Sequence, residues 1–414
     1  MKKVATNEAS RPRPRRILLL IDGLEGDGAE RQLCELAKGL QRRTDFEPHV
    51  GVLEANETGH AWMLEELGIV VNLFERRSRF DLSPLKRIVA YIRDHDIELV
   101  HGYLSMGSEF GLLAAKWCRI PAITSSIRNG MNRDWRERVR TTYQSYLADF
   151  SVANSNAGFR SRFRRRRDSF RVIYNGFDLE RFSISEADRA AVRAELDLTG
   201  EARPICMAAR MEPEKDHRTL LDAMRLLQSK HPDAVLLLAG QGRLRSLLEA
   251  HARECRLENR VRFLGHRRDV ERIMSICEAS VLLTNTEIHL EGVSNTIIES
   301  MALGTPVLAT RGGGTDEVLG EEDAGRPPYV HGIKVEPFEP AQVAEGLGYY
   351  LDHDTERRQI GAAARKMVVE RFNLSRFIAD NVALYRELER KGVEGPTTSA
   401  EQSPGGDPPV SQRP

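Results

Sequence analysis

Short apolar runs alternate with amphipathic stretches along the first part of the chain. Residues 16–22 form an apolar run typical of a buried strand, and residues 29–40 place leucines on one face at helical spacing. The alternation continues with apolar and helical units at 49–53, 69–73, 85–93, 98–101, 107–117 and 122–127. It predicts a parallel sheet covered by helices on both faces.

A charged, helix-prone connection at residues 182–203 separates this series from a second one. The second series predicts strands at 204–210, 234–239, 261–264, 279–286 and 305–310, and helices at 219–229, 244–253 and 270–277. Two such series predict an α/β protein with two Rossmann-like domains, at residues 15–182 and 200–372, that face a central cleft. Ligands of such sheets bind beyond the carboxyl ends of the strands.

The stretch from Ala279 to Thr310 carries the most specific chemistry. After the buried strand, a polar loop holds Glu291 and Gly292, and a helix with apolar residues at helical spacing begins at Ser294 or Asn295. The backbone amides of Val293, Ser294 and Asn295 at the start of this helix favour a phosphate.

Two glutamates stand on opposite sides of those amides. Glu299 lies roughly 7 Å along the helix axis at 1.5 Å per residue. That is about the reach from a diphosphate to its ribose, whose two hydroxyls one carboxylate accepts. Glu291, on the other side of the amides, would face the group attached to the phosphate farther from the ribose. The alternative without a ligand is that Glu291 is a solvated loop residue and Glu299 a helix-capping residue.

This stretch resembles the signature of the family 4 retaining glycosyltransferases, which reads Glu-Gly, a Glu-rich helix and Gly-x-Pro-Val. Residues 291–299, EGVSNTIIE, and 304–307, GTPV, fit it throughout. The resemblance spans residues 16–391 and implies the GT-B fold. It also implies transfer of a sugar, with retention, from a nucleotide diphosphate sugar to a hydroxyl acceptor.

The resemblance also implies the roles of individual residues. Arg210 and Lys215 match residues that bind the donor diphosphate. Together with Glu291 at the donor sugar and His101 in the first domain, they form the expected catalytic set. Glu299 would bind the ribose. Gly28 belongs to a loop over the donor, and Gly265 and His266 lie where the family places backbone groups against the base.

A histidine near the end of a strand in the first domain contacts the donor sugar in many relatives, often as His-x-His. This chain has His101-Gly102-Tyr103, so either His101 or Tyr103 takes that role. Residues 150–155 and 170–178 resemble the closing strands of that domain, and the amphipathic helix at 375–391 resembles one that crosses back to it.

No cofactor or metal is expected besides the nucleotide sugar. Two fixed cations stabilise the charge of a leaving diphosphate without a divalent ion. The two Asp-x-Asp sequences, at 94–96 and 352–354, do not follow an apolar strand and are expected to be solvated turns. Three glycine motifs fail the dinucleotide fingerprint, at 26–31, 240–245 and 312–317, which argues against an NAD enzyme.

The composition excludes several classes. A formal net charge of +0 in 414 residues argues against general nucleic-acid affinity. Five cysteines without a Cys-x-x-Cys spacing indicate reduced thiols rather than a disulfide framework or zinc site. We recognise no signal peptide and no bilayer-length apolar run, so a cytoplasmic enzyme is expected. The polar residues 1–14 and 393–414 are expected to be disordered.

Six arginines within residues 160–167 form a strongly basic run. Such a run attracts an anionic membrane by up to about 1 kcal/mol per charge, which suits peripheral binding and a lipid-linked acceptor. The alternative is a solvated helix.

The expected function is a glycosyltransferase acting on a glycan or lipid-linked intermediate of bacterial surface polysaccharide, lipopolysaccharide included. Three alternatives stay open: a phosphorylase or sucrose-synthase-like enzyme of the same fold, a non-catalytic scaffold that binds nucleotide sugars, and, third, the NAD oxidoreductase.

Overall fold

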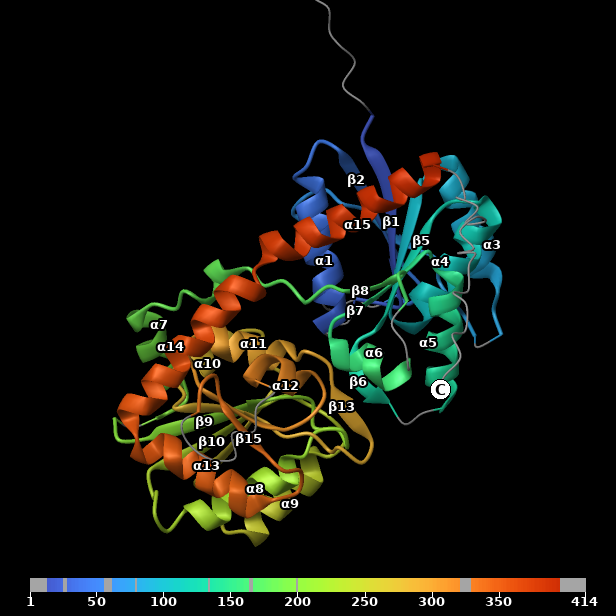
Figure 1. Ribbon diagram of the computed structural model, residues 1–414. Helices are drawn as coiled ribbons and strands as arrows, with labels where there is room; N and C mark the ends of the chain where they lie inside the picture. The colour runs from blue at the N-terminus through green and yellow to red at the C-terminus, as the bar shows by residue number, and fades with distance from the viewer. Residues whose placement is uncertain are drawn as a thin grey trace, which may run out of the picture.

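The computed structural model describes residues 13–24, 28–55, 62–78, 80–132, 135–163, 167–198, 200–320 and 329–394. The segments expected to be disordered lie mostly outside these residues. Figure 1 shows two α/β domains, the first in blue and green and the second in yellow and orange. This arrangement confirms the predicted class of two Rossmann-like domains.

The first domain is built on a seven-stranded parallel sheet in the order β3-β2-β1-β4-β5-β7-β8. Its central strands are buried on both faces, as expected for a sheet covered by helices. The strands are β1 Arg15–Ile21, β2 Phe46–Val52, β3 Val71–Leu73, β4 Leu99–Tyr103, β5 Ala122–Ile127, β7 Phe150–Ala153 and β8 Phe170–Val172. The helices are α1 Gly28–Gln41, α2 Trp62–Glu65, α3 Ser83–Asp94, α4 Leu104–Cys118, α5 Trp135–Leu147 and α6 Asn156–Arg162.

The second domain has a six-stranded parallel sheet in the order β11-β10-β9-β12-β14-β15. Its strands are β9 Arg203–Ala208, β10 Ala234–Ala239, β11 Val261–Gly265, β12 Ala279–Leu282, β14 Val307–Thr310 and β15 Ile333–Val335. The helices are α7 Glu186–Glu195, α8 His217–Leu227, α9 Arg245–Glu254, α10 Val270–Met274, α11 Asn295–Ala302, α12 Gly314–Leu319, α13 Pro340–Asp352 and α14 Asp354–Arg371. A short 3-10 turn, η1 Leu179–Phe182, precedes α7.

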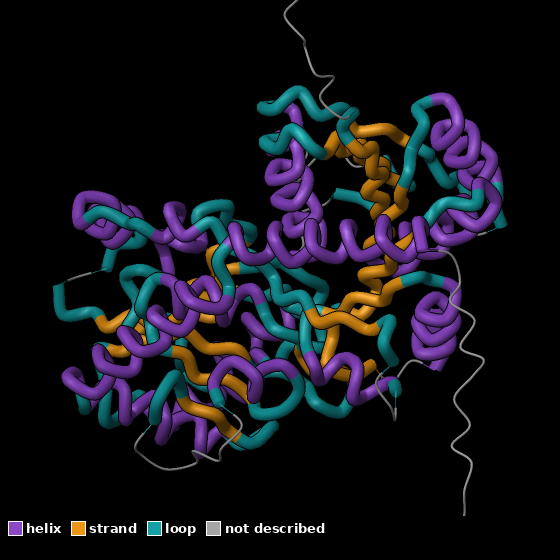
Figure 2. The backbone as a smooth tube through the Cα atoms, turned by 45° about the horizontal axis from the view of Figure 1, so that its top comes forward, coloured by secondary structure: helices purple, strands orange, loops and turns teal. Residues whose placement is uncertain are grey.

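The last helix, α15 Leu374–Glu394, leaves the second domain and lies across the first, as Figures 1 and 2 both show. The carbonyl of Tyr385 accepts a hydrogen bond from Arg15 at 2.9 Å, and Glu387 pairs with Arg171 at 2.9 Å. Phe377, Tyr385 and other apolar residues of α15 join the core of the first domain. Helix α15 therefore holds the two domains together.

A two-stranded antiparallel sheet joins the domains at a second place. Strand β6, Asn129–Asn132, belongs to the first domain, and β13, His289–Glu291, belongs to the second. Asn129 lies opposite Glu291 in the register. The predicted loop at Glu291 is wrong, because the pairing with β6 holds the backbone of Glu291 in a strand.

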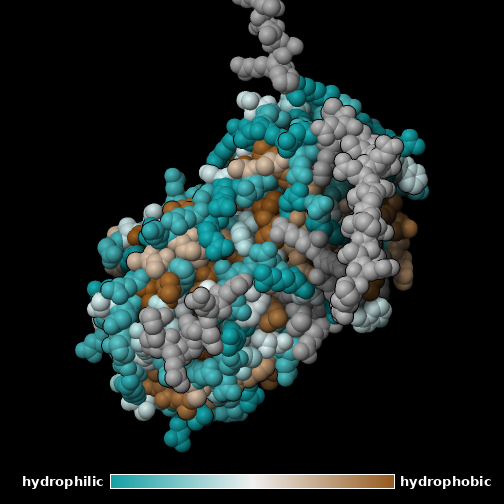
Figure 3. Space-filling view, in the orientation of Figure 1, coloured by the Kyte–Doolittle hydropathy of each residue, from teal (hydrophilic) through white to brown (hydrophobic). Residues whose placement is uncertain are grey.

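The surface of the molecule is mostly hydrophilic on the face seen in Figure 3. On the face seen in Figure 3, hydrophilic residues surround small hydrophobic patches. Among the described helices, none combines the length and the apolar character that crossing a bilayer requires.

Candidate active site

The ammonium of Lys215 and the carboxylate of Glu291 form an ion pair at the interface between the domains. Lys215 lies in the loop between β9 and α8, and Glu291 ends β13. The hydroxyl of Thr284 donates to the paired oxygen of Glu291 at 3.3 Å, and Nε2 of His289 lies 3.7 Å from it. The side chains of the pair are only 16% and 11% exposed.

The charge on Glu291 is maintained by these neighbours. Burial alone would raise the pKa of Glu291, but the positive charge of Lys215 and the contact with His289 outweigh it and hold the pKa below its usual value. Glu291 is therefore ionised at neutral pH, and it holds the ammonium of Lys215 in place.

Glycines bring the backbone of this site into close contact. A Cβ on Gly292 would lie 2.5 Å from the carbonyl oxygen of Arg128 and 2.6 Å from Oδ1 of Asn154, both in the first domain. A Cβ on Gly314, the first residue of α12, would lie 2.2 Å from the carbonyl carbon of Gly292. Only glycine fits at either position, so Gly292 lets the two domains approach each other beside Glu291.

The N-terminus of α11 lies at the same interface. Ser294 is its N-cap and makes no side-chain capping hydrogen bond, and Val293 before it is buried. Oδ1 of Asn295 accepts from Nδ2 of Asn175 in the first domain at 2.6 Å. A Cβ on Gly28 would collide with the amide group of Asn295. The structure thus brings Gly28 to the helix terminus, while residues 25–27 of its loop lie outside the described residues.

Glu299, further along α11, pairs with Arg31 of α1 at 3.0 Å. Burial raises the pKa of Glu299 to about 7; the charge of Arg31 opposes this rise and that of Glu271 adds to it. In the sequence, Arg31 only ends the glycine motif at 26–31 that fails the dinucleotide fingerprint, and its contact with Glu299 was not predicted. Helical periodicity cannot reveal it, because the two residues lie in different domains.

Three other predicted residues lie at the ends of β9 and β11, the two strands that flank β10 in the second sheet. Arg210 follows β9, is exposed, and has no hydrogen bond or ion pair with any described residue. Gly265 ends β11 with φ +70°, which favours glycine, and its carbonyl accepts from the amide of Gly240 at 2.8 Å. The side chain of His266 is exposed.

His101 and Tyr103 are both buried at the end of β4 in the first domain. His101 is 0% exposed, and its ring nitrogens contact the hydroxyl of Tyr385 at 2.8 Å and Oγ of Ser125 at 2.7 Å. Burial lowers the pKa of His101 to about 3, with a smaller contribution from the charge of Arg128. Tyr103 is buried as well. In this structure, His101 joins α15 to the first sheet, and its contact with a donor sugar stays a prediction.

Two polar residues near the interface were missed by the sequence analysis. One oxygen of Glu317, on α12, accepts from the amide of Asn156 and the hydroxyl of Tyr174, both at 3.0 Å. The other accepts from the amide of Ala157 at 2.6 Å. Glu317 therefore caps α6 of the opposite domain. Nη2 of Arg128 is buried and has no hydrogen-bond partner among the described residues.

The basic run lies beside an aromatic surface. Arg160 is exposed, Arg162 donates to the carbonyl of Asn129 at 3.1 Å, and residues 164–166 lie outside the described residues. A surface pocket of about 490 Å³ is lined by Trp135, Arg138, Val139, Thr142, Tyr143, Tyr146 and Arg162. Thus α5 and α6 present exposed aromatic rings and arginines on one surface.

The fold and these contacts define a two-domain α/β protein with a charged site at the domain interface. The family model described as "Glycosyl transferases group 1" matches residues 188–367, and the model "Glycosyltransferase Family 4" matches residues 26–181. Together these models cover most of both domains. The chain belongs to the group 1 glycosyltransferases of family 4.

Two curated relatives are named as glycosyltransferases with particular substrates. A GDP-mannose-dependent monoacylated α-(1-6)-phosphatidylinositol monomannoside mannosyltransferase of Corynebacterium glutamicum is 25% identical over 61% of this chain and 62% of that protein. A D-inositol 3-phosphate glycosyltransferase of Corynebacterium urealyticum is 26% identical over 77% of this chain and 78% of that protein. The first match therefore spans less than two thirds of that relative's length.

Solved structures share the fold. HepE of Anabaena, in a complex with UDP-glucose, superposes with a TM-score of 0.79 at 23% identity over 90% of this chain and 99% of that one. This likeness confirms the GT-B arrangement of the two domains.

Proposed function

We propose that this protein is a retaining glycosyltransferase that moves a sugar from a nucleotide diphosphate sugar to a hydroxyl acceptor without a catalytic metal ion. The observation that carries the proposal is the meeting of Lys215, Glu291 and the N-terminus of α11 at the domain interface. These groups offer one cation, one carboxylate and one set of backbone donors beside the carboxyl ends of parallel strands.

The donor diphosphate binds Lys215 and Arg210 in this proposal. Both residues lie in the loop between β9 and α8, and Arg210 has no competing partner among the described residues. A diphosphate that binds Lys215 would balance part of the positive charge of its ammonium, which Glu291 balances in this structure. The amides at the start of α11, near Val293 and Ser294, add uncharged donors on the other side.

Glu291 and Glu299 bind the two ends of the donor. Lys215 turns toward the phosphates, which leaves the oxygens of Glu291 free to accept hydroxyls of the sugar. Glu299 accepts the ribose hydroxyls after Arg31 moves away. Gly265 and His266, at the end of β11, lie beside the base.

The reaction breaks the bond between the anomeric carbon and the phosphate oxygen. The nucleoside diphosphate leaves with the electron pair, and the acceptor oxygen attacks from the same face. The acceptor proton passes to the departing phosphate oxygen. Arg210 and Lys215 stabilise the charge that develops, and loss of one such group typically costs about a hundredfold to a thousandfold in rate.

The acceptor proposed is a glycan or lipid-linked intermediate of a bacterial surface polysaccharide, lipopolysaccharide included. The relative from Corynebacterium glutamicum is named for a phosphatidylinositol mannoside acceptor, which is in line with a lipid-linked substrate. Arg160 and the aromatic surface of α5 would hold the enzyme at an anionic membrane, as a peripheral protein on the cytoplasmic face.

The test is a panel of UDP-, GDP- and ADP-sugars, scored first by the shift in Tm and then by release of nucleoside diphosphate with and without chelator. We expect one donor to raise Tm and to be turned over equally well with chelator present. No binding of any donor contradicts the proposal. So does turnover that disappears in chelator and returns with manganese.

A further inference from the structure

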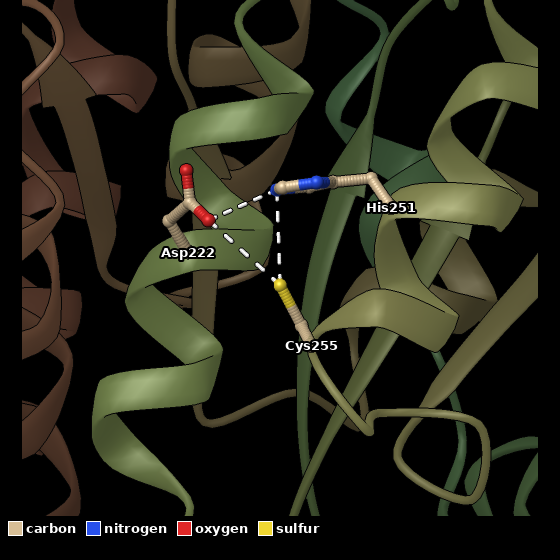
Figure 4. A group of neighbouring side chains, drawn as sticks. All are labelled: Asp222, His251 and Cys255. Carbon is tan, nitrogen blue, oxygen red and sulfur yellow. Dashed lines mark hydrogen bonds and ion pairs between the residues drawn. The ribbon is translucent and has the colours of Figure 1, made fainter.

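Three side chains with metal-binding atoms meet on the second domain, outside the proposed active site. Figure 4 shows Asp222 projecting from α8 toward His251 and Cys255, which come from the end of α9. His251 and Cys255 are four residues apart, a spacing that places both on the same face of a helix. Asp222 completes the group from the neighbouring helix.

The distances between the donor atoms match a tetrahedral zinc site. Cys255 Sγ lies 3.8 Å from Asp222 Oδ1 and 3.7 Å from His251 Nε2. Bond lengths of about 2.3 Å to sulfur and about 2.0–2.2 Å to nitrogen and oxygen, at tetrahedral angles, require sulfur to lie about 3.6 Å from each of the others. The distance from His251 Nε2 to Asp222 Oδ1 is 2.9 Å. Tetrahedral coordination of one ion requires this nitrogen and this oxygen to lie about 0.5 Å further apart than they do here.

The histidine is also oriented as a metal ligand requires. His251 Nδ1 lies 3.4 Å from a carboxylate oxygen of Glu254. A carboxylate at Nδ1 favours the tautomer that carries its proton there, so the lone pair of Nε2 points toward Asp222 and Cys255. This order of carboxylate, histidine and metal recurs in zinc proteins.

Burial and chemistry select the kind of ion. Cys255 is buried, whereas the side chains of Asp222 and His251 are 28% and 14% exposed, so an ion enters from their side. Thiolate and imidazole prefer zinc and similar ions to magnesium and calcium. We propose that Asp222, His251 and Cys255 form a site for Zn²⁺, with a water molecule as the fourth ligand.

The place of the site indicates what the ion does. Helix α8 follows the loop of Lys215, and α9 follows the glycine loop at residues 240–242. An ion held by both helices would fix them relative to each other without touching the donor. The expected consequence is a more stable second domain, with no direct part in the transfer reaction.

The test uses full-length protein without a histidine tag, freed of metal with a chelator. Zn²⁺ is titrated against a chelating indicator, and Co²⁺ is added separately as a spectroscopic probe. We expect one tight equivalent of Zn²⁺, a rise in Tm, and the near-ultraviolet charge-transfer absorption of a thiolate bound to Co²⁺. Cys255→Ser should remove that absorption, and His251→Gln should weaken Zn²⁺ binding by at least tenfold.

Cys118→Ser is the matched control, because Cys118 is a thiol on α4 of the other domain. It should bind Zn²⁺ as the wild type does. Failure of the wild type to bind, or equal binding by Cys255→Ser, overturns the proposal. Should Cys255→Ser not fold, His251→Gln and the Co²⁺ spectrum of the wild type still decide. None of these readouts depends on glycosyl transfer.

Discussion

The guanidinium of Arg31 lies 3.0 Å from the carboxylate of Glu299, and the two residues belong to different domains. The proposed role of Glu299 is to accept the ribose hydroxyls, so in this structure Arg31 occupies the place proposed for the ribose. Binding of the donor then requires an exchange of partners: Arg31 leaves and the ribose takes its place.

This exchange predicts a pH dependence of donor binding. The pKa of Glu299 is raised to about 7, so at pH 6 its carboxyl is mostly protonated, and a ribose that needs the carboxylate must displace a proton. We expect the affinity for a nucleotide sugar to rise between about pH 6 and 8 and then to level off. In a nucleotide sugar, the sugar esterifies the terminal phosphate, which therefore lacks the second ionisation that a phosphate monoester has near pH 6. The ligand itself does not titrate in this range.

Calorimetry in two buffers of different ionisation enthalpy measures this effect as proton release at pH 6. Glu299→Gln is the matched control, since it keeps an acceptor oxygen but cannot ionise. Its affinity should be weaker at pH 8 and constant across the range. Proton release that persists in Glu299→Gln would assign the effect to another group.

The ion pair of Lys215 and Glu291 makes a second prediction, because stability and activity can be separated there. Removing one partner leaves a buried charge, so Lys215→Ala should lose about 3–5 kcal/mol of unfolding free energy. The double variant Lys215→Met/Glu291→Gln removes both charges and should recover most of that loss. Its transfer rate should nonetheless stay at least a hundredfold below the wild type.

Urea unfolding and transfer assays on the same preparations measure both quantities. Normal turnover by the stable double variant would show that the pair only supports the fold, and would remove both residues from the proposed catalytic set.

The contact of Glu317 with α6 gives a third prediction. Glu317→Gln replaces one carboxylate oxygen by an amino group, a donor that faces the amide of either Asn156 or Ala157, which is itself a donor. The expected cost is about 1–3 kcal/mol at the domain interface. Hydrogen exchange should therefore quicken at these two amides. Exchange in β1, far along the same domain, serves as the internal reference and should not change.

The sequence predicted the strands and helices of both sheets better than it predicted how the domains meet. Apolar runs such as residues 16–22 are long enough to identify a buried strand, and the structure has β1 at Arg15–Ile21. Strands β6 and β13 are short, and each exists only because the other domain supplies its partner. No local pattern marks such a pair.

The same reason explains which site residues were found. Glu291 and Glu299 lie in a motif of known spacing, and Lys215 matches a family residue by resemblance, so the sequence pointed to them. Arg31 and Glu317 act across the interface, where only folded coordinates show the contact. The contact of His101 with Tyr385 was not predicted, because a motif indicates the strand end but not the burial produced there by α15.

Membrane binding is the fourth prediction. Trp135, at the start of α5, is 67% exposed beside the arginines of α5 and α6. Trp135→Ser should weaken sedimentation with vesicles of phosphatidylglycerol and phosphatidylcholine, and salt should weaken it further. Trp117→Ser is the matched control, because Trp117 is also 67% exposed but lies on α4. Equal losses in both variants would argue against a specific surface.

The buried His101 gives the last prediction, on stability against acid. The folded protein keeps this ring neutral down to about pH 3, whereas the unfolded chain binds a proton near the ordinary value of 6.5. Stability from this residue is therefore complete above pH 6.5 and falls as the pH drops below it, by about 1.4 kcal/mol per unit. Between pH 6.5 and 5 the loss amounts to about 2 kcal/mol.

Urea unfolding of the wild type and His101→Gln at pH 7 and pH 5 measures this loss. Glutamine keeps a donor and an acceptor for Ser125 and Tyr385 but does not titrate. The variant should be less stable at pH 7, and the gap should narrow by about 2 kcal/mol at pH 5. A constant gap would mean that the ring is protonated in the fold, and His101 would then need an anionic partner.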